Sequence, residues 1–268
     1  MNSTVHPLQA LLSDPRHARV AKRGSGVLAV VLLAGLVWVA VAQGGTRLDT
    51  PMGQALAGSA VAALATALGA LPALFVRRIS ARWEDVMLGF GAGVMAAAAC
   101  FSLILPGVAA ATDIVGNKPA GTAIVAAGLV LGALFLLLAD KAVPHEHPSA
   151  GRHGPDWMHL RRVWLMVFAI ALHNFPEGMA IGVGFSGGDA AVGIPLAVAI
   201  AIQDIPEGLV VAVALRTVAY APWQAAAAGA LTGLAEPLGA IVGVALTSGI
   251  AVLYPVGLGF AAGAMIWV

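Results

Sequence analysis

The side chains most capable of chemistry in this chain form two similar groups inside long apolar stretches. We call them the two cassettes: residues 173–178 (HNFPEG) and residues 203–208 (QDIPEG). Each cassette has metal-binding types of side chain at positions i, i+1 and i+4, with a proline directly before the glutamate. Ionisable side chains are costly in hydrocarbon, so a duplicated cluster of them indicates a bound cation or a polar cavity.

Helical spacing divides each cassette into two sets of candidate ligands. Residues four apart share a helix face with roughly 6 Å of rise, so the side chains at i and i+4 can reach one ion. These pairs are His173 with Glu177, and Gln203 with Glu207. Asn174 and Asp204 are rotated by about 100° and are placed to serve a second ion. The two glutamates then suit bridging positions.

The prolines predict a disturbed backbone beside the candidate ligands. A proline removes one N–H and frees the carbonyl four residues earlier, which kinks a helix. Such backbone is tolerated within a membrane where it faces protein or a water-filled cavity. Glu236-Pro237 again combines a glutamate with a proline, and we expect the same disturbed backbone on the next predicted helix.

Four acidic residues fall near the middles of predicted membrane spans, where no Lys or Arg is present. They are Glu177, Asp204, Glu207 and Glu236. Four unpaired carboxylates would cost about 10 kcal/mol or more, at roughly 2.5 to 3.5 kcal/mol each. Protonation or a bound divalent cation could offset this cost, and the ligand-like spacing favours the cation.

The candidate ligands combine one imidazole with carboxylates and amides. Met95, in a glycine-rich segment, could add a thioether, although a lone methionine is more typical of packing. Nitrogen, oxygen and a soft sulfur together fit Zn²⁺, Cd²⁺, Fe²⁺ or Mn²⁺ better than Mg²⁺ or Ca²⁺. The ligand types do not select among these four metals.

The composition identifies a polytopic membrane protein. Hydrophobic residues make up 60% of 268, charged residues 10%, and the mean hydropathy is +0.91. The apolar runs are too long for barrel strands, so we predict an all-α bundle of about eight spans. These spans cover approximately 26–43, 53–76, 86–112, 120–139, 162–184, 190–215, 222–248 and 252–268.

Basic residues predict the orientation of these spans. Twelve of the fourteen Lys and Arg residues lie in alternate segments, and the opposite loops hold only Arg47 and Lys118. By the positive-inside rule, the N-terminus and the loops near 80, 150 and 218 face the cytoplasm. We expect the protein to be a multi-pass protein of the cell (inner) membrane.

The two ends of the chain differ from the rest. We expect a cytoplasmic segment at 1–25, followed at 26–43 by either an extra transmembrane helix or a signal peptide, since Ala40-Val41-Ala42 resembles a cleavage site. The sequence stops at Val268 inside an apolar run, which gives the appearance of a missing final helix.

A polar, histidine-bearing loop is predicted at about 140–162. Its best candidates for a secondary metal site are Asp140, His145 and His147. His-rich tracts can bind metal weakly, and the alternative is a solvated loop that happens to contain histidine.

The two cassettes resemble the signature helices of the ZIP (Zrt/Irt-like) family of divalent metal transporters, in a prokaryotic form. The resemblance covers residues from about 53 to 268, including the cytoplasmic histidine-bearing loop. It implies a transporter core of eight helices, seven of them present here, that moves by an elevator-like or rocking motion. It also implies homodimers, which many members form. We expect no nucleic-acid partner.

The resemblance further implies a binuclear site at mid-membrane. One ion would be held by Met95, His173, Glu177, Gln203 and Glu207, and the other by Asn174, Glu177, Asp204, Glu207 and Glu236. Many members begin the second cassette with histidine, whereas this chain has Gln203, a weaker ligand. A His-Glu pair that the family usually carries after a run like 252–268 is missing.

Three functions compete at this point. The leading interpretation is uptake of divalent transition metal, most favourably Zn²⁺, into the cytoplasm by a protein that is not an enzyme. An intramembrane zinc-dependent hydrolase is the alternative, but the sequence has no His-Glu-x-x-His and leaves no spare carboxylate as general base. A proton conductor would explain the buried acids, but not the imidazole, amides and thioether.

Overall fold

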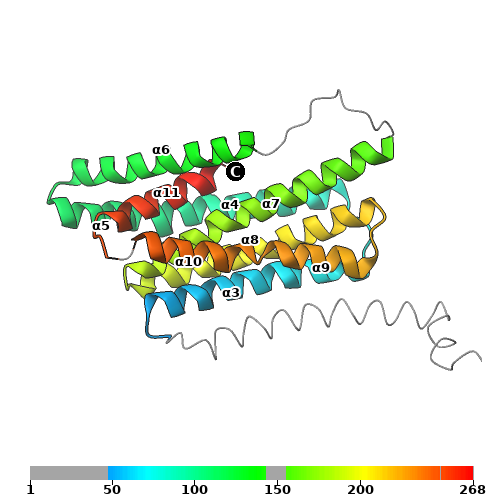
Figure 1. The fold of residues 1–268 in the computed structure, drawn as a ribbon, viewed down its shortest axis with the longest axis horizontal. Coiled ribbons are helices and arrows are strands. Elements are labelled where there is room, and N and C mark those ends of the chain that lie inside the picture. The colour runs from blue at the N-terminus through cyan, green and yellow to red at the C-terminus, as the bar shows by residue number, and fades with distance from the viewer. Residues whose placement is uncertain (1–47, 143–154, 248, 268) are drawn as a thin grey trace, which may run out of the picture.

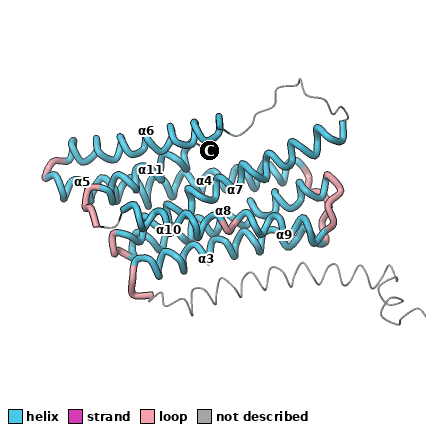
Figure 2. The backbone as a smooth tube through the Cα atoms, viewed as in Figure 1, coloured by secondary structure: helices cyan, strands magenta, loops and turns pink. Residues whose placement is uncertain are grey.

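The protein is a bundle of helices in the computed structural model, which describes residues 48–142, 155–247 and 249–267. Within these ranges every regular element is a helix, as Figure 2 shows. The helices run roughly alongside one another, with α6 and α11 on one side of the bundle in Figure 1 and α3 and α9 on the other. The predicted all-helical architecture is confirmed for these residues.

The helices follow one another with short connections. Their bounds are α3 Pro51–Ala70, α4 Ala81–Ala98, α5 Leu105–Val115, α6 Lys118–Ala142, α7 Pro155–Ser186, α8 Ala190–Thr217, α9 Pro222–Thr232, α10 Ala235–Thr247 and α11 Leu253–Trp267. A 3₁₀ turn, Leu71–Leu74, extends α3, and a π-helical turn, Ala99–Ile104, joins α4 to α5.

Six helical stretches of the described chain are long and apolar enough to cross a membrane. They are Pro51–Leu74, Ala81–Val115, Lys118–Leu138, Arg162–Ser186, Ala190–Thr217 and Pro222–Thr247. Leu253–Trp267 is apolar but shorter. This set supports a polytopic membrane bundle, and the predicted segments at 1–25 and 26–43 lie outside the described residues.

Side-chain caps begin α3, α4 and α8, where the sequence changes from polar to apolar. Thr50 Oγ1 accepts a hydrogen bond from the Gly53 N–H at 3.1 Å, and Ser80 Oγ accepts one from Trp83 at 3.3 Å. Asp189 caps α8 by accepting from the Ala191 N–H at 2.8 Å. Each cap satisfies a backbone donor that the first turn leaves without an intrahelical partner.

The span predicted at 222–248 is present as the apolar stretch Pro222–Thr247, but it is divided into α9 and α10, so the interior proline kink predicted at Glu236-Pro237 is wrong. Pro237 therefore lies in the first turn of α10, not inside a continuous helix, and no intrahelical bond is lost. The Gly233 carbonyl, which Pro237 cannot satisfy, accepts from the Glu236 N–H at 3.2 Å. In contrast, α7 and α8 continue through Pro176 and Pro206.

Two further boundaries differ from the predicted spans. The span predicted at 86–112 begins at Ala81, because Ser80 provides a cap, and it contains the π-helical turn just after Met95. Helices α6 and α7 extend into the polar stretch predicted at 140–162, up to Ala142 and from Pro155.

Glycine lets the helices that carry the cassettes approach their neighbours backbone to backbone. A Cβ on Gly178 of α7 would collide with the carbonyl oxygen of Glu236 in α10, and one on Gly239 of α10 would collide with that of Phe175. A Cβ on Gly208 of α8 would likewise meet the carbonyl of Thr66 in α3. The final glycine of each cassette therefore fixes a close helix pair, as small residues do in membranes.

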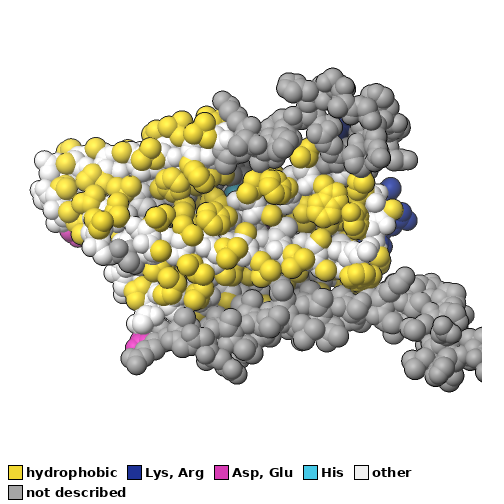
Figure 3. Space-filling view, in the orientation of Figure 1, with side chains coloured by type: hydrophobic (Ala, Val, Ile, Leu, Met, Phe, Trp, Pro, Cys, Tyr) yellow, Lys and Arg dark blue, Asp and Glu magenta, His cyan; other side chains and the backbone are white. Residues whose placement is uncertain are grey.

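The outer surface is apolar along its length. Hydrophobic side chains cover most of the described flank seen in Figure 3, and Lys and Arg gather at one end of the bundle. Exposed arginines of that end include Arg77, Arg78 and Arg82, in and after the connection from α3 to α4. An apolar flank with a basic end is the surface expected of a membrane bundle.

Candidate metal site

The two cassettes meet in the interior of the bundle. The first lies on α7 and the second on α8, and α10 brings Glu236 to the same region through its contact with Gly178. Met95 reaches them from the last turn of α4. Each predicted ligand is therefore carried by a helix that packs against α7 or α8.

The first group of side chains converges as the i, i+4 spacing predicts. His173 Nε2 lies 3.4 Å from Oε1 of Glu177 and 3.2 Å from Sδ of Met95. The side-chain amide of Gln203 donates a hydrogen bond to the same Glu177 Oε1. One imidazole nitrogen, one thioether and one carboxylate oxygen thus share a small volume.

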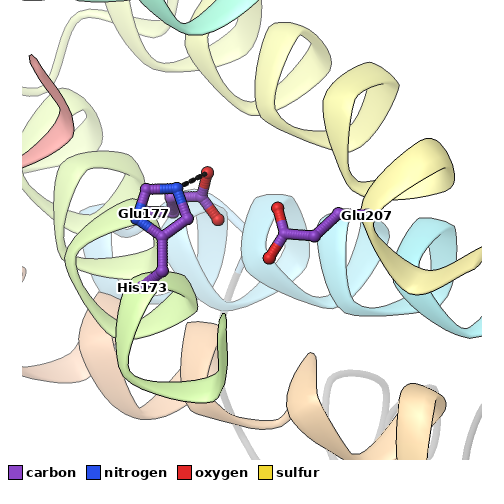
Figure 4. A group of neighbouring side chains, drawn as sticks. All are labelled: His173, Glu177 and Glu207. Carbon is purple, nitrogen blue, oxygen red and sulfur yellow. Dashed lines mark ion pairs between the residues drawn. The ribbon is translucent and has the colours of Figure 1, made fainter. Parts of the chain in front are cut away.

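Glu207 completes this group from the opposite helix. Figure 4 shows its carboxylate extending from α8 toward His173 and Glu177 on α7. One ligand atom from each of these three residues lies within 4.8 Å of the other two. Around a tetrahedral Zn²⁺ with bonds of about 2.0 to 2.2 Å, ligand atoms are about 3.3 to 3.6 Å apart. The three residues are thus within a small adjustment of zinc geometry.

The second predicted group is buried more deeply. Asn174, Asp204 and Glu236 have no exposed surface. The charge of Asp204 interacts with those of Glu236 and Glu207, and the charge of Glu177 interacts with those of Glu207 and Asp204. The four carboxylates therefore form one electrostatic cluster, and Asn174 adds buried amide atoms on the α7 side.

Buried polar atoms without hydrogen bonds are concentrated in these residues. The atoms are His173 Nδ1, Asn174 Nδ2 and Oδ1, Glu177 Oε2, Gln203 Oε1, Asp204 Oδ1 and Oδ2, Glu207 Oε1 and Glu236 Oε2. A buried polar atom without a partner costs about 1 to 3 kcal/mol, and more when charged. Nine such atoms in one cluster are typical of a site built for a ligand and not of a structural core.

In the described part of the chain, no Lys or Arg reaches this cluster. Within the described ranges, Lys and Arg lie at or near helix ends, and the ion pair within the cluster is the one between His173 and Glu177. A cluster of carboxylates at this depth needs positive charge from outside the chain. A divalent cation supplies that charge and also fits the mixed donor set.

A cavity of about 350 Å³ adjoins the first group. Met95, His173, Gln203 and Glu207 are among the residues that line it, together with Met87 and Met166. Met87 precedes Met95 by about two helical turns on α4, and Met166 precedes His173 by the same amount on α7. From Met95 to Met87 along α4, and from His173 to Met166 along α7, the chain therefore leads toward the end of the bundle that carries the basic residues.

Sequence reasoning missed one polar residue of the site and the role of two glycines. Thr66 on α3 donates a hydrogen bond from Oγ1 to Oε1 of Glu236 at 3.1 Å. Gly178 and Gly208 are needed for the close approach of α10 and α3. The repeated Glu-Gly pair was a sequence signal for the role of the glycines. Thr66 lies among alanines and belongs to no motif, so no sequence signal pointed to it.

The secondary metal site predicted in the loop cannot be placed. His145 and His147 lie outside the described residues. Asp140 belongs to the last turn of α6, and its side chain is not among those described. This site therefore stays a prediction.

Comparison with known proteins was made after this geometry was established. Residues 144–268 match the family described as "ZIP Zinc transporter". The chain is 52% identical over 249 residues to the zinc transporter ZIPB of Bordetella bronchiseptica, covering 93% of this chain and 79% of that protein. It is 41% identical over 217 residues to the zinc transporter GufA of Myxococcus xanthus, covering 81% and 85%.

The similarity extends to animals. The human zinc transporter ZIP11 is 30% identical over 296 residues, covering 80% of this chain and 86% of that protein. The matched stretches are too long to be limited to the two cassettes, so the likeness concerns the whole bundle and not an isolated motif.

Proposed function

This chain belongs to the ZIP family of zinc transporters, and from that premise we propose that it carries Zn²⁺ through the buried cluster on α7, α8 and α10. Membership makes it a transporter and not an intramembrane hydrolase, the alternative that the sequence left open. The observation that carries the site assignment is the set of nine buried polar atoms without hydrogen bonds, all on predicted ligands.

We assign two ion positions to the cluster. The first is formed by Met95, His173, Glu177, Gln203 and Glu207, and the second by Asn174, Glu177, Asp204, Glu207 and Glu236. Two positions are supported by the charge balance, since four carboxylates match two divalent cations. Glu177 and Glu207 lie close enough to the carboxylates of the second group for their charges to repel one another, and this proximity is what bridging ligands require.

The first position is the more selective for transition metals. It contains the imidazole and the thioether, which suit Zn²⁺ and Cd²⁺, whereas the second has oxygen ligands and one amide. Fe²⁺ and Mn²⁺ are expected as weaker substrates, because their preference for these softer donors is lower.

The direction of transport is inward in this proposal. The residues that line the cavity beside His173 extend along α4 and α7 to Met87 and Met166, toward the basic end of the bundle, and the positive-inside rule assigns that end to the cytoplasm. We therefore propose that an ion at the first position leaves toward the cytoplasm. With this orientation, in a protein of the cell membrane, the segments near 80, 150 and 218 would face the cytoplasm.

Zinc uptake into proteoliposomes tests the assignment. Glu177→Ala and His173→Ala should each reduce the initial rate of Zn²⁺ and Cd²⁺ uptake at least tenfold, because each removes a ligand and leaves other charges unpaired. Asp85→Ala, which removes an exposed carboxylate from the start of α4, is the matched control and should keep the wild-type rate.

Two results would contradict this proposal. Wild-type rates in the Glu177 and His173 variants would mean that the ions cross elsewhere. Anomalous scattering from crystals soaked in zinc should locate two ions between α7, α8 and α10, and ions bound away from these helices would refute the two-position site.

A further inference from the structure

Thr66 reaches the site from a helix that carries none of the predicted ligands. It lies on α3 and is fully buried. Its Oγ1 is 3.1 Å from Oε1 of Glu236 and 3.3 Å from the carbonyl oxygen of Ala62, four residues earlier. A hydroxyl has one proton to donate, and the closer, charged acceptor is the stronger one. The hydroxyl therefore hydrogen-bonds to Glu236 in preference to its own helix.

This bond makes the two oxygens of Glu236 unequal. Oε1 accepts from Thr66, whereas Oε2 is buried and makes no hydrogen bond. With one oxygen held, the carboxylate plane cannot rotate freely. Oε2 is then the oxygen left to bind an ion, and it binds from a fixed direction.

Glu236 needs this support more than the two cassette glutamates do. Glu177 and Glu207 lie inside the long helices α7 and α8, where flanking turns fix the backbone. Glu236 is the second residue of α10 and follows the break at Gly233 and Leu234. A side chain in the first turn after a break has fewer neighbours on its own helix to set its direction.

Thr66 is itself fixed by both neighbouring elements. A Cβ built on Gly208, the residue after Glu207, would collide with the Thr66 carbonyl oxygen. A Cβ built on Gly233 would lie 3.0 Å from the Thr66 Cβ and 3.1 Å from its Oγ1. Thr66 thus contacts α8 beside Glu207 and contacts the helix break just before Glu236. Both glutamates are proposed ligands of the second position.

We propose that Thr66 is a positioning residue for the second ion position, where its hydroxyl orients Glu236. The inference rests on the two-position site proposed above, but it makes a separate claim. It predicts that removal of one hydroxyl outside the ligand set weakens one ion position and leaves the other intact.

Thr66→Val is the decisive variant, because it keeps the shape of the side chain and removes the hydroxyl. Zn²⁺ binding to the purified protein in detergent, measured by calorimetry, should show two ions for the wild type. Thr66→Val should weaken the second ion by about 10- to 100-fold, the usual effect of losing a group that orients a metal ligand. Thr66→Ser restores a hydroxyl and should bind within about threefold of the wild type.

Thr112→Val on α5 is the matched control. It makes the same substitution at a threonine whose Oγ1 bonds the carbonyl oxygen four residues earlier, at 2.6 Å, and it lies outside the site. It should leave both ions unchanged. Anomalous scattering from Thr66→Val crystals soaked in zinc should show loss of occupancy at the second position only, which a general structural defect would not produce.

A combined variant keeps the test valid even if Thr66→Val is less stable. In a Glu236→Ala background the hydroxyl has no carboxylate to orient, so adding Thr66→Val should cause no further loss of zinc binding. Equal losses with and without Glu236 would overturn the inference, as would wild-type affinity for both ions in Thr66→Val. If the wild type bound no zinc between α7, α8 and α10, the two-position site itself would fail instead.

Discussion

Gly178→Ala is the most direct test of the way in which packing builds this site. The change adds one methyl group, on α7, immediately after Glu177, which is the proposed bridging ligand. That methyl would collide with the carbonyl oxygen, Cα and carbonyl carbon of Glu236. These are backbone atoms, so no side-chain rotation can make room, and α7 and α10 must move apart.

The size of the effect follows from this collision. Unstrained nonbonded atoms are about 3.5 Å apart, so the two helices must separate by on the order of 1 Å beside the site. Overpacking of this kind costs about 1 to 3 kcal/mol. The separation also draws Glu236 away from Glu177 and Asp204, for which we expect a loss of zinc affinity of about 10- to 100-fold.

Two measurements separate these effects, with a control that the chain supplies. Thermal unfolding in detergent should show Gly178→Ala lowering the midpoint by roughly 3 to 10 °C, and zinc uptake into proteoliposomes should fall at least tenfold. Gly89→Ala on α4 makes the same change where a Cβ would meet nothing within 4 Å. It should be neutral or slightly stabilising, because alanine favours a helix over glycine.

The reasoning would be refuted if Gly178→Ala matched Gly89→Ala in both midpoint and uptake. A lower midpoint with normal uptake would be equally damaging to the functional claim, because it would separate the α7–α10 contact from the metal site.

Two other substitutions probe the composition of the first ion position. Gln203→His replaces an amide that donates to Glu177 with a stronger zinc ligand, so zinc affinity measured by calorimetry should rise roughly 5- to 10-fold, or about 1 to 1.4 kcal/mol. The maximal uptake rate should fall, because zinc release is slower. Unchanged affinity would exclude Gln203 as a ligand. Met95→Leu keeps an apolar side chain of similar size and removes the sulfur that lies 3.2 Å from His173 Nε2. Because sulfur is a soft ligand, the ratio of Cd²⁺ to Zn²⁺ uptake should fall. A constant ratio would show that Met95 serves packing alone.

Local sequence rules predicted much of the site. Helical spacing places His173 and Glu177 on one face, and the structure brings them to 3.4 Å. The absence of Lys and Arg from the same depth was readable from the sequence alone. The facing of His173 and Glu177 and the depth of the charged residues can each be predicted for a single helix, because the 3.6-residue period and the position along the helix determine them.

Features that depend on two helices were not predictable. The break before α10 was missed because Glu236-Pro237 suits an interior kink and a first turn equally well, and packing against Gly178 and Thr66 decides between them. Thr66 was missed because a buried threonine in a membrane helix usually bonds to its own backbone. Its bond to Glu236 joins residues 170 positions apart.

The nine buried atoms without hydrogen bonds have a consequence for stability as well as for transport. The oxygen atoms among them gain a partner if a cation binds at the proposed site, so Zn²⁺ would bind the folded protein far better than the unfolded chain. By mass action, an ion at 100 times its dissociation constant adds about 2.7 kcal/mol to the free energy of unfolding. In the proposed site, the transported ion would therefore be a structural component during its passage, and the fold would be weakest just after the carrier has released it.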